Sequence, residues 1–268
     1  MDLPNIHVNI PALIRSAMDI NAKLHKFYRV ARRRIVPKLR YSQDLYQEVL
    51  EMVINSESRW LDIGCGHQIL PPWKLSEEQQ LITNAAQVVG IDYDWPSLLK
   101  HTTIADRLQG TADALPFGNG SFNLVTANMV VEHLDNPSTQ FREISRVLKP
   151  NGIFIFHTVN AVGYFAKLRR LVPAQWVKPI AKALDGRESD DVFEVQYKAN
   201  SESDIVKLAT ESNFEIEQFR MISSDATFAL VPPLAVVELF WIRLLMSSSF
   251  RRFRTNLIVV LRKKNSEI

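Results

Sequence analysis

Two acidic residues that end apolar runs are the residues of this chain best suited to binding a ligand. Asp62 is followed by the two-glycine turn Gly64-Cys65-Gly66, and Asp92 ends the next apolar run. Such runs are typical of strands in a parallel sheet, whose carboxyl ends share one edge and bind nucleotides there. Glycine has no Cβ, so the backbone of the turn can bend sharply and lie close to a ligand. The Asp92 carboxylate can accept hydrogen bonds from both ribose hydroxyls, so we expect a nucleoside at this edge.

The segment from Asp62 to Gly66 resembles the first motif of the class I S-adenosyl-L-methionine (SAM) methyltransferases, and Asp92 is similar to their ribose-binding acid. Four later segments are similar, in order and spacing, to the branch of this family that methylates small molecules. That branch includes quinone, sterol and glycan-precursor methyltransferases. The segments are residues 110–117, 121–128, 132–134 and 143–152. The resemblance extends over about residues 58–160 and implies that SAM is the cofactor.

A nicotinamide dinucleotide is the alternative cofactor, because it also binds a glycine-rich turn after a strand. Its fingerprint, G-x-G-x-x-G, needs a third glycine, and Ile69 stands at that position here. The methyltransferase motif often has a further glycine where this chain has Gln68. The sequence therefore disfavours a nicotinamide-dependent oxidoreductase and favours a SAM-binding protein.

The resemblance also implies what individual residues bind. Asp62 would hold the turn and the methionine amine of SAM. Asp113 would accept a hydrogen bond from the adenine amino group, and the backbone N–H of Ala114 would donate to the ring. Asn128 and Met129 lie at the carboxyl end of the fourth predicted strand, where such sheets bind ligands, so we expect them to contact the methionine part. The alternative for Met129 is a side chain that only fills the core. The expected cofactor-binding residues are Asp62, Gly64, Cys65, Gly66, Asp92, Tyr93, Asp113, Ala114, Asn128 and Met129.

Two histidines at the predicted ligand edge are candidate catalytic bases. Methyl transfer to oxygen needs a group that removes a proton, and the pKa of histidine lies near neutrality. His133 follows the fourth predicted strand, where many relatives also have a histidine, and His157 ends the fifth. The alternative for His133 is a histidine that packs or hydrogen-bonds below the pocket.

Other reactive residue types give weaker signals. Cys65 is the only cysteine, so no internal disulfide forms, and we do not expect it to act as a nucleophile. The His, Cys, Asp and Glu residues show no metal-site spacing, so no metal is predicted. Tyr197, Lys198 and Asn200 are similar to a Tyr-Arg-x-Asn pattern of some relatives that act on glycan or lipid intermediates. They either line the substrate pocket or form a turn before a helix.

Strands and helices alternate along the part of the chain that must position these residues. Strands are expected near 58–63, 87–92, 107–112, 122–128 and 152–158, and helices near 75–85, 95–103 and 138–148. A helix capped by Ser201 and strands at 214–219 and 255–261 follow. Alternation of this kind predicts an α/β fold, a doubly wound Rossmann-like parallel sheet with helices on both faces. The resemblance implies seven strands, the last of them antiparallel.

Two helical segments precede the first predicted strand and are separated by Pro37. We expect residues 1–54 to form an N-terminal helical cap and residues 55–268 to form the SAM-binding domain. Within that domain, residues 160–200 and 221–254 are predicted insertions that act as lids.

The two ends of the chain are basic and the middle is acidic. Residues 1–40 contain nine Lys or Arg and two Asp or Glu. Residues 41–219 contain fifteen Lys or Arg and twenty-four Asp or Glu, and residues 220–268 contain eight Lys or Arg and three Asp or Glu. The apolar segment 234–246 lies in the basic C-terminal part. Together these features fit peripheral contact with an anionic membrane, or a lid helix over an apolar pocket with solvated arginines outside. The basic segments lack a nucleic-acid-binding motif, so no nucleic-acid partner is expected.

The predicted function is transfer of a methyl group from SAM to an apolar or amphipathic small molecule, such as a quinone, a lipid or a lipid-linked glycan intermediate. The alternative is a non-catalytic SAM-fold protein that acts as a membrane-associated partner or regulator. The N-terminus lacks a signal-peptide pattern, and segment 234–246 is short and contains Glu238 and Arg243. We therefore expect a cytoplasmic protein. The sequence does not decide whether it also contacts the inner face of the membrane peripherally. The acceptor atom and the oligomeric state are also left open.

Overall fold

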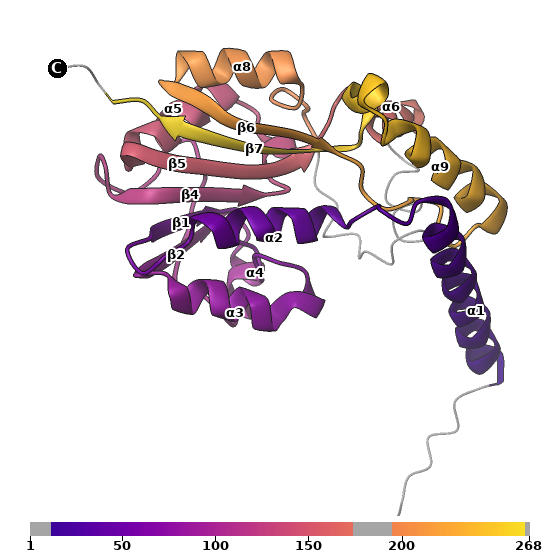
Figure 1. Cartoon of the computed structure of the whole chain (residues 1–268). Helices are drawn as coiled ribbons and strands as arrows, with labels where there is room; N and C mark the ends of the chain where they lie inside the picture. Colours follow the sequence, from indigo (N-terminus) through magenta and orange to yellow (C-terminus); the bar gives the residue numbers. More distant parts are fainter. Residues whose placement is uncertain (1–11, 174–194, 266–268) are drawn as a thin grey trace, which may run out of the picture.

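The computed structural model describes residues 12–173 and 195–265. Its centre is a seven-stranded sheet in the order β3-β2-β1-β4-β5-β7-β6 (Figure 1). Strands β1 to β5 pair in parallel, whereas β7 is antiparallel to both β5 and β6. The strands are β1 (Arg59–Ile63), β2 (Gln87–Asp92), β3 (Asp106–Gln109), β4 (Phe122–Asn128), β5 (Leu148–Val159), β6 (Phe214–Ile222) and β7 (Asn256–Lys263). The predicted mostly parallel Rossmann-like sheet is confirmed.

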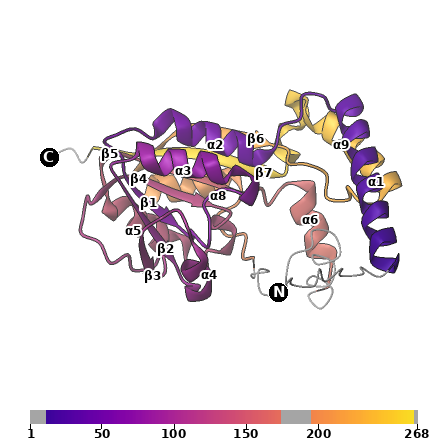
Figure 2. The same cartoon turned by 90° about the horizontal axis from the view of Figure 1, so that it is seen from below.

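Helices cover both faces of this sheet (Figures 1 and 2). On one face lie α2 (Ser42–Val53), α3 (Leu75–Asn84) and α4 (Trp95–Lys100). On the other lie α5 (Pro137–Val147) and α8 (Glu202–Glu211). The Ser201 side chain caps α8 by accepting a hydrogen bond from the amide of Asp204, as predicted. Residues 1–11 of the predicted cap and 174–194 of the first predicted insertion lie outside the described residues.

Successive residues of the central strands point into two different apolar cores. Trp60 of β1 and Leu124 of β4 pack with α2 and α3, whereas their neighbours Leu61 and Val125 pack with α5 and α8. Side chains alternate between the faces of a strand, and here both faces are buried. This is why the central strands are mostly apolar rather than alternately polar.

A pair of helices lies beyond the carboxyl ends of the parallel strands (Figures 1 and 2). It consists of α1 (Ala12–Ile35) and α9 (Pro232–Leu245), which follows β6. Their shared apolar core contains Tyr28, Val36 and Leu39 from the α1 side and Ala235, Leu239 and Ile242 from α9. The short α6 (Tyr164–Leu171) and the 3-10 helix η4 (Ser248–Phe253) complete this region. The two helices predicted to form one N-terminal cap therefore pack in different places. Helix α1 packs on α9, within the predicted insertion 221–254, and α2 packs on the sheet.

Asp225, in the loop between β6 and α9, attaches α1 to this loop. Its carboxylate accepts hydrogen bonds from the Tyr28 hydroxyl and from Nε of Arg32, the latter at 3.0 Å. The Ala226 amide donates to the Tyr28 hydroxyl at 3.1 Å. Burial, together with the neighbouring Asp225 carboxylate, raises the pKa of Tyr28 far above its ordinary value, so the hydroxyl stays protonated and donates. No helix within the described ranges is long and apolar enough to cross a membrane.

We predict that Asp225→Ala loosens α1 without unfolding the sheet. Removing the acceptor leaves Tyr28 and Arg32 without their partner, which costs about 1–3 kcal/mol. Hydrogen exchange should therefore become faster at amides of residues 21–35 and remain unchanged in β1 and β4. Glu217→Ala, which removes a surface partner of Arg262, is the control. Unchanged exchange in α1 would show that this carboxylate does not anchor the helix.

Candidate active site

The turn after β1 has a backbone shape that requires glycine. Gly64 and Gly66 have φ values of +67° and +50°. The amides of Gly64 and Cys65 both donate to the carbonyl of Ile91, at 2.7 and 3.3 Å, which ties the turn to β2. A Cβ on Gly64 would lie 2.3 Å from a methyl carbon of Val130. A Cβ on Gly66 would instead enter open space, with the Asp92 carboxylate as its nearest neighbour at 4.0 Å.

Asp92 ends β2 beside this open space. One carboxylate oxygen accepts from the Gly66 amide and the other from the Asp94 amide, both at 2.8 Å. Asp94 in turn caps α4 through the amide of Ser97. Each Asp92 oxygen keeps acceptor capacity for a further donor. A cradle without side chains next to a fixed carboxylate fits the ribose of SAM. Tyr93, the next residue, is 54% exposed at the same edge.

Asp62 lies below the turn and is 1% exposed. The hydroxyl of Thr126 donates to its carboxylate and accepts from the indole nitrogen of Trp60 at 2.6 Å. Burial raises the pKa of Asp62 to about 8, so the group is largely protonated at neutral pH. A cation bound nearby favours the ionised form of a buried carboxyl. The amine of SAM is such a cation, so this residue also fits the cofactor.

The side chain of Cys65 points away from the ligand edge and into the core. A Cβ added to Gly90 of β2 would lie 2.7 Å from its sulfur. Burial raises the pKa of the thiol far above its ordinary value, so it remains protonated. Only the backbone of Cys65 is therefore available to a ligand in the turn.

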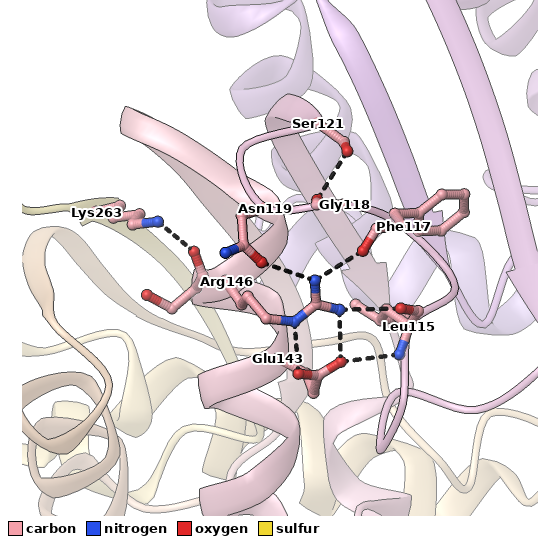
Figure 3. A network of polar contacts seen from close by, with 9 residues as sticks. Leu115, Phe117, Gly118, Asn119, Ser121, Glu143, Arg146 and Lys263 are labelled. Atoms are coloured by element: carbon pink, nitrogen blue, oxygen red, sulfur yellow. Dashed lines mark hydrogen bonds and ion pairs between the residues drawn. The ribbon is translucent and has the colours of Figure 1, made fainter.

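The loop that follows Asp113 and Ala114 is held in place by α5 through contacts to Leu115, Phe117 and Asn119 (Figure 3). Arg146 reaches from the helix and donates to the carbonyls of Leu115 and Phe117, at 2.9 and 2.7 Å. Glu143 accepts two hydrogen bonds from the same guanidinium and one from the Leu115 amide. Asp113 is half-buried and Ala114 exposed. The loop expected to contact adenine is thus fixed by a bidentate ion pair.

Asn128 ends β4 and connects three other parts of the chain. Its amide nitrogen donates to the carbonyl of Ile69, at 2.8 Å, and to the side-chain oxygen of Gln43 on α2, at 3.0 Å. Its oxygen lies 2.9 Å from Nδ1 of His157 on β5. The next residue, Met129, has a φ of +58°, a conformation that is costly for a side chain with a Cβ. Such residues cluster at functional sites.

His157 has surroundings unlike those of a general base. It is 1% exposed and stacks on the ring of Tyr46, with centroids 5.7 Å apart. A neutral ring with its proton on Nδ1 donates to Asn128 and accepts from Asn256 at Nε2, at 3.2 Å. Burial lowers the pKa of His157 to about 3, which makes it a weak base. These contacts favour a positioning role over the predicted catalytic one.

His133 lies in the 3-10 helix η2 (Val131–His133), directly after β4, and is half-buried. The preceding Glu132 is buried, and its carboxylate accepts from the Thr158 hydroxyl at 2.6 Å. Asn200 donates to the same hydroxyl at 2.7 Å and to the carbonyl of Val159. Asn200 therefore has a structural role, while η2 holds His133 at the carboxyl edge.

Sequence reasoning missed three residues that shape this site. Gln43 and Tyr46 come from α2, and Glu78 comes from α3 and is 1% exposed. Glu78 accepts from the amides of Ile69 and Leu70, at 2.9 and 2.7 Å, and so fixes the end of the cofactor turn. The sequence did offer a signal for Glu78: it lies three residues before the inward-facing Leu81, and residues at this spacing share one face of a helix. The same spacing marks Tyr46, which lies three and four residues before the inward-facing Val49 and Leu50, whereas no comparable signal marks Gln43.

Comparison with known proteins agrees with this geometry. Residues 61–156 match a family model described as a methyltransferase domain. The chain is 34% identical over 123 residues to malonyl-[acyl-carrier protein] O-methyltransferase of Legionella pneumophila, over 42% of this chain and 40% of that protein. It is 30% identical over 112 residues to ubiquinone biosynthesis O-methyltransferase of Xanthomonas oryzae pv. oryzae, over 38% of this chain and 44% of that protein. The matches thus span less than half the length of these relatives.

A solved SAM-dependent methyltransferase from Methanosarcina mazei has a similar fold, with a TM-score of 0.54 at 18% identity. That similarity covers 81% of this chain and 98% of the other. Residues 61–156 therefore match a methyltransferase domain, and the chain has the fold of a SAM-dependent methyltransferase. These similarities support SAM as its cofactor. Within the described part of the chain, no group of three or more His, Cys, Asp or Glu side chains is arranged to hold a metal ion.

We predict that Arg146→Lys weakens SAM binding about five- to tenfold, about 1–1.4 kcal/mol. An ammonium cannot reproduce the planar fork that bonds Glu143 and two carbonyls at once, so the adenine loop becomes less ordered. Calorimetric titration with SAM measures the effect. Arg142→Lys, on the same helix but bonded only to its own turn through Ser138, is the control. Equal affinity for both variants would contradict the role given to Arg146.

We also predict that Asp62 makes the SAM-free protein less stable as pH rises. The pKa of Asp62 is raised from 3.8 to about 8 on folding, so between these values the folded protein holds a proton that the unfolded chain has lost. Stability from this group is present at low pH and is lost toward pH 8, by at most about 1.4 kcal/mol per pH unit. Asp62→Asn removes this dependence, and the exposed Asp106→Asn should not. The measurement is denaturation of the wild type and both variants at several pH values. If the free energy of unfolding depended on pH equally in all three proteins, the raised pKa assigned to Asp62 would be contradicted.

Proposed function

We propose that the protein transfers the methyl group of SAM to an oxygen atom of an apolar or amphipathic small molecule. The observation that carries this proposal is a cofactor cradle at Gly66 and Asp92 on the same sheet edge as the half-buried His133. The relatives named as malonyl-[acyl-carrier protein] and ubiquinone biosynthesis O-methyltransferases support an oxygen acceptor. The exposed apolar side chains of the neighbouring α9 support an apolar molecule.

When bound, SAM supplies an electrophilic methyl group attached to a positively charged sulfur. The chain aligns the two reactants. Asp92 would accept hydrogen bonds from the ribose, the loop held by Arg146 would contact the adenine, and Asp62 would pair with the amine. Alignment of this kind can lower a barrier by about 7–11 kcal/mol.

His133 is the base in this proposal. A half-buried imidazole can receive the proton of a hydroxyl acceptor while that oxygen attacks, which contributes roughly 10²–10⁴-fold. His157 acts through Asn128 instead, because it is only 1% exposed and its Nδ1 lies 2.9 Å from the Asn128 side-chain oxygen. It is a positioning residue that keeps the end of β4 in register with β5.

The direct experiment is incubation of the purified protein with methyl-labelled SAM and cell extract, followed by separation of lipid and aqueous phases. We expect label in the lipid phase together with S-adenosylhomocysteine. Asp92→Ala should abolish both, because the ribose loses its acceptor, whereas the exposed Asp106→Ala should not. A protein that binds SAM but never yields S-adenosylhomocysteine would instead be a non-catalytic member of the fold.

Once an acceptor is known, we predict that His133→Gln lowers kcat at least about 100-fold with little change in SAM affinity. The remaining rate of the variant should rise with pH, since a hydroxyl that ionises on its own needs no base. His157→Gln should weaken SAM binding as well, because it disturbs Asn128. Full turnover in His133→Gln would remove this residue from the mechanism and indicate an acceptor that is already ionised.

A further inference from the structure

Helix α9 is apolar on two opposite sides. Among the described residues, one side is buried and the other stays largely exposed, apart from an edge contact of the Trp241 ring with Tyr164. Ala235, Leu239 and Ile242 are buried against α1. The opposite side, here called the α9 face, consists of five large side chains that recur at helical spacing. They are Leu234, Val237, Phe240, Trp241 and Leu244, with exposed fractions of 48, 68, 56, 38 and 42%. Contiguous exposed apolar surface of this kind marks an interaction site.

The α9 face is held outward by polar contacts on the rest of the helix. Arg254 donates to the carbonyls of Leu245 and Met246, at 2.8 and 2.9 Å, and so fixes the C-terminal end. Glu238 accepts from the Tyr164 hydroxyl at 2.7 Å and from the amides of Thr227 and Phe228. Rotation of α9 to hide its apolar side chains would break these bonds, so the exposure is a built feature.

Within the described residues, the exposed charged side chains of α9 and η4 are all cationic. Arg243 lies on the helix itself, and Arg251 and Arg252 follow in η4, all three exposed. The only acids between residues 221 and 254 are Asp225 and Glu238, and both bond within the protein. Residues 21–40, which include most of α1 on the opposite side of α9, add eight Lys or Arg and no acid to the same region. An apolar surface with a cationic surround is complementary to an anionic lipid bilayer.

The location of α9 fits such a contact. The α1 and α9 pair lies beyond the carboxyl ends of the parallel strands, on the side where the cofactor turn opens (Figures 1 and 2). Contact through this region would bring the cofactor edge close to molecules dissolved in the bilayer.

We propose that the protein docks reversibly on membranes that contain anionic lipids, through the α9 face and its surrounding arginines. Phe240, Val237 and Leu244 enter the boundary between headgroups and acyl chains, and Arg243, Arg251 and Arg252 contact lipid phosphates. This inference goes beyond the proposed methyl transfer and does not depend on it, because vesicle binding is measured without SAM or acceptor.

The test is sedimentation of the full-length protein with vesicles of phosphatidylcholine alone or mixed with phosphatidylglycerol, at low and high salt. We expect binding to the mixed vesicles at low salt, and weaker binding at high salt, because basic residues near the surface lose their attraction as salt screens it. Phe240→Ser with Leu244→Ser, and separately Arg251→Gln with Arg252→Gln, should each weaken partitioning at least about tenfold.

Met52→Ser with Leu99→Ser is the matched control, since those side chains are 71 and 66% exposed on other helices. It should bind vesicles like the wild type, and circular dichroism should show that every variant is folded. Absence of binding to mixed vesicles at low salt overturns the proposal. If light scattering then shows a dimer that Phe240→Ser with Leu244→Ser dissociates, the α9 face is an interface between two copies of this chain. Equal losses of vesicle binding in the control variant and the α9-face variant would also overturn the proposed membrane docking.

Discussion

The side-chain amide of Asn128 is the contact on which the site depends most. It joins the end of β4 to α2 through Gln43, to the cofactor turn through the Ile69 carbonyl, and to β5 through His157. These pieces come from distant parts of the chain, and each must be in place for the others to find their partners. Buried polar networks are favourable only when fully satisfied. The network therefore orders the carboxyl edge before any ligand arrives, so less binding energy is needed to order it.

Buried carboxyls give this edge its electrostatic character. Asp62, Glu78 and Asp92 are all nearly inaccessible, and the charges of Glu78 and Asp92 add to the burial that raises the pKa of Asp62. Isolated buried charges are costly unless a counter-charge is present. A cationic ligand would relieve part of this cost, so the same residues that destabilise the empty site favour SAM. Residues 21–40, which include most of α1, instead contain eight Lys or Arg and no acid, so this helix is basic whereas the cofactor site is acidic.

Much of the fold could be predicted because each central strand is buried on both faces and forms a continuous apolar run with a polar residue at its end. That same double burial hid the environment of His157, since no alternation along β5 shows which side its ring takes. The third strand was predicted to extend to residue 112, but it ends at Gln109. The next amide, of Gly110, donates a hydrogen bond to the Asp92 carbonyl. Gln43 was missed because its partner Asn128 is 85 residues away. The first and second predicted helices could not be assigned to separate layers without knowing what each packs against.

The central claim is that one preformed edge, built from the turn at Gly64, Asp92 and the loop at Asp113, binds SAM. Hydrogen exchange measured with and without saturating SAM tests it most directly. The account predicts slower exchange in the segments 63–67, 92–95 and 112–117, with no change in β6 or α8. Slower exchange confined to other segments, or none at saturating SAM, would contradict it.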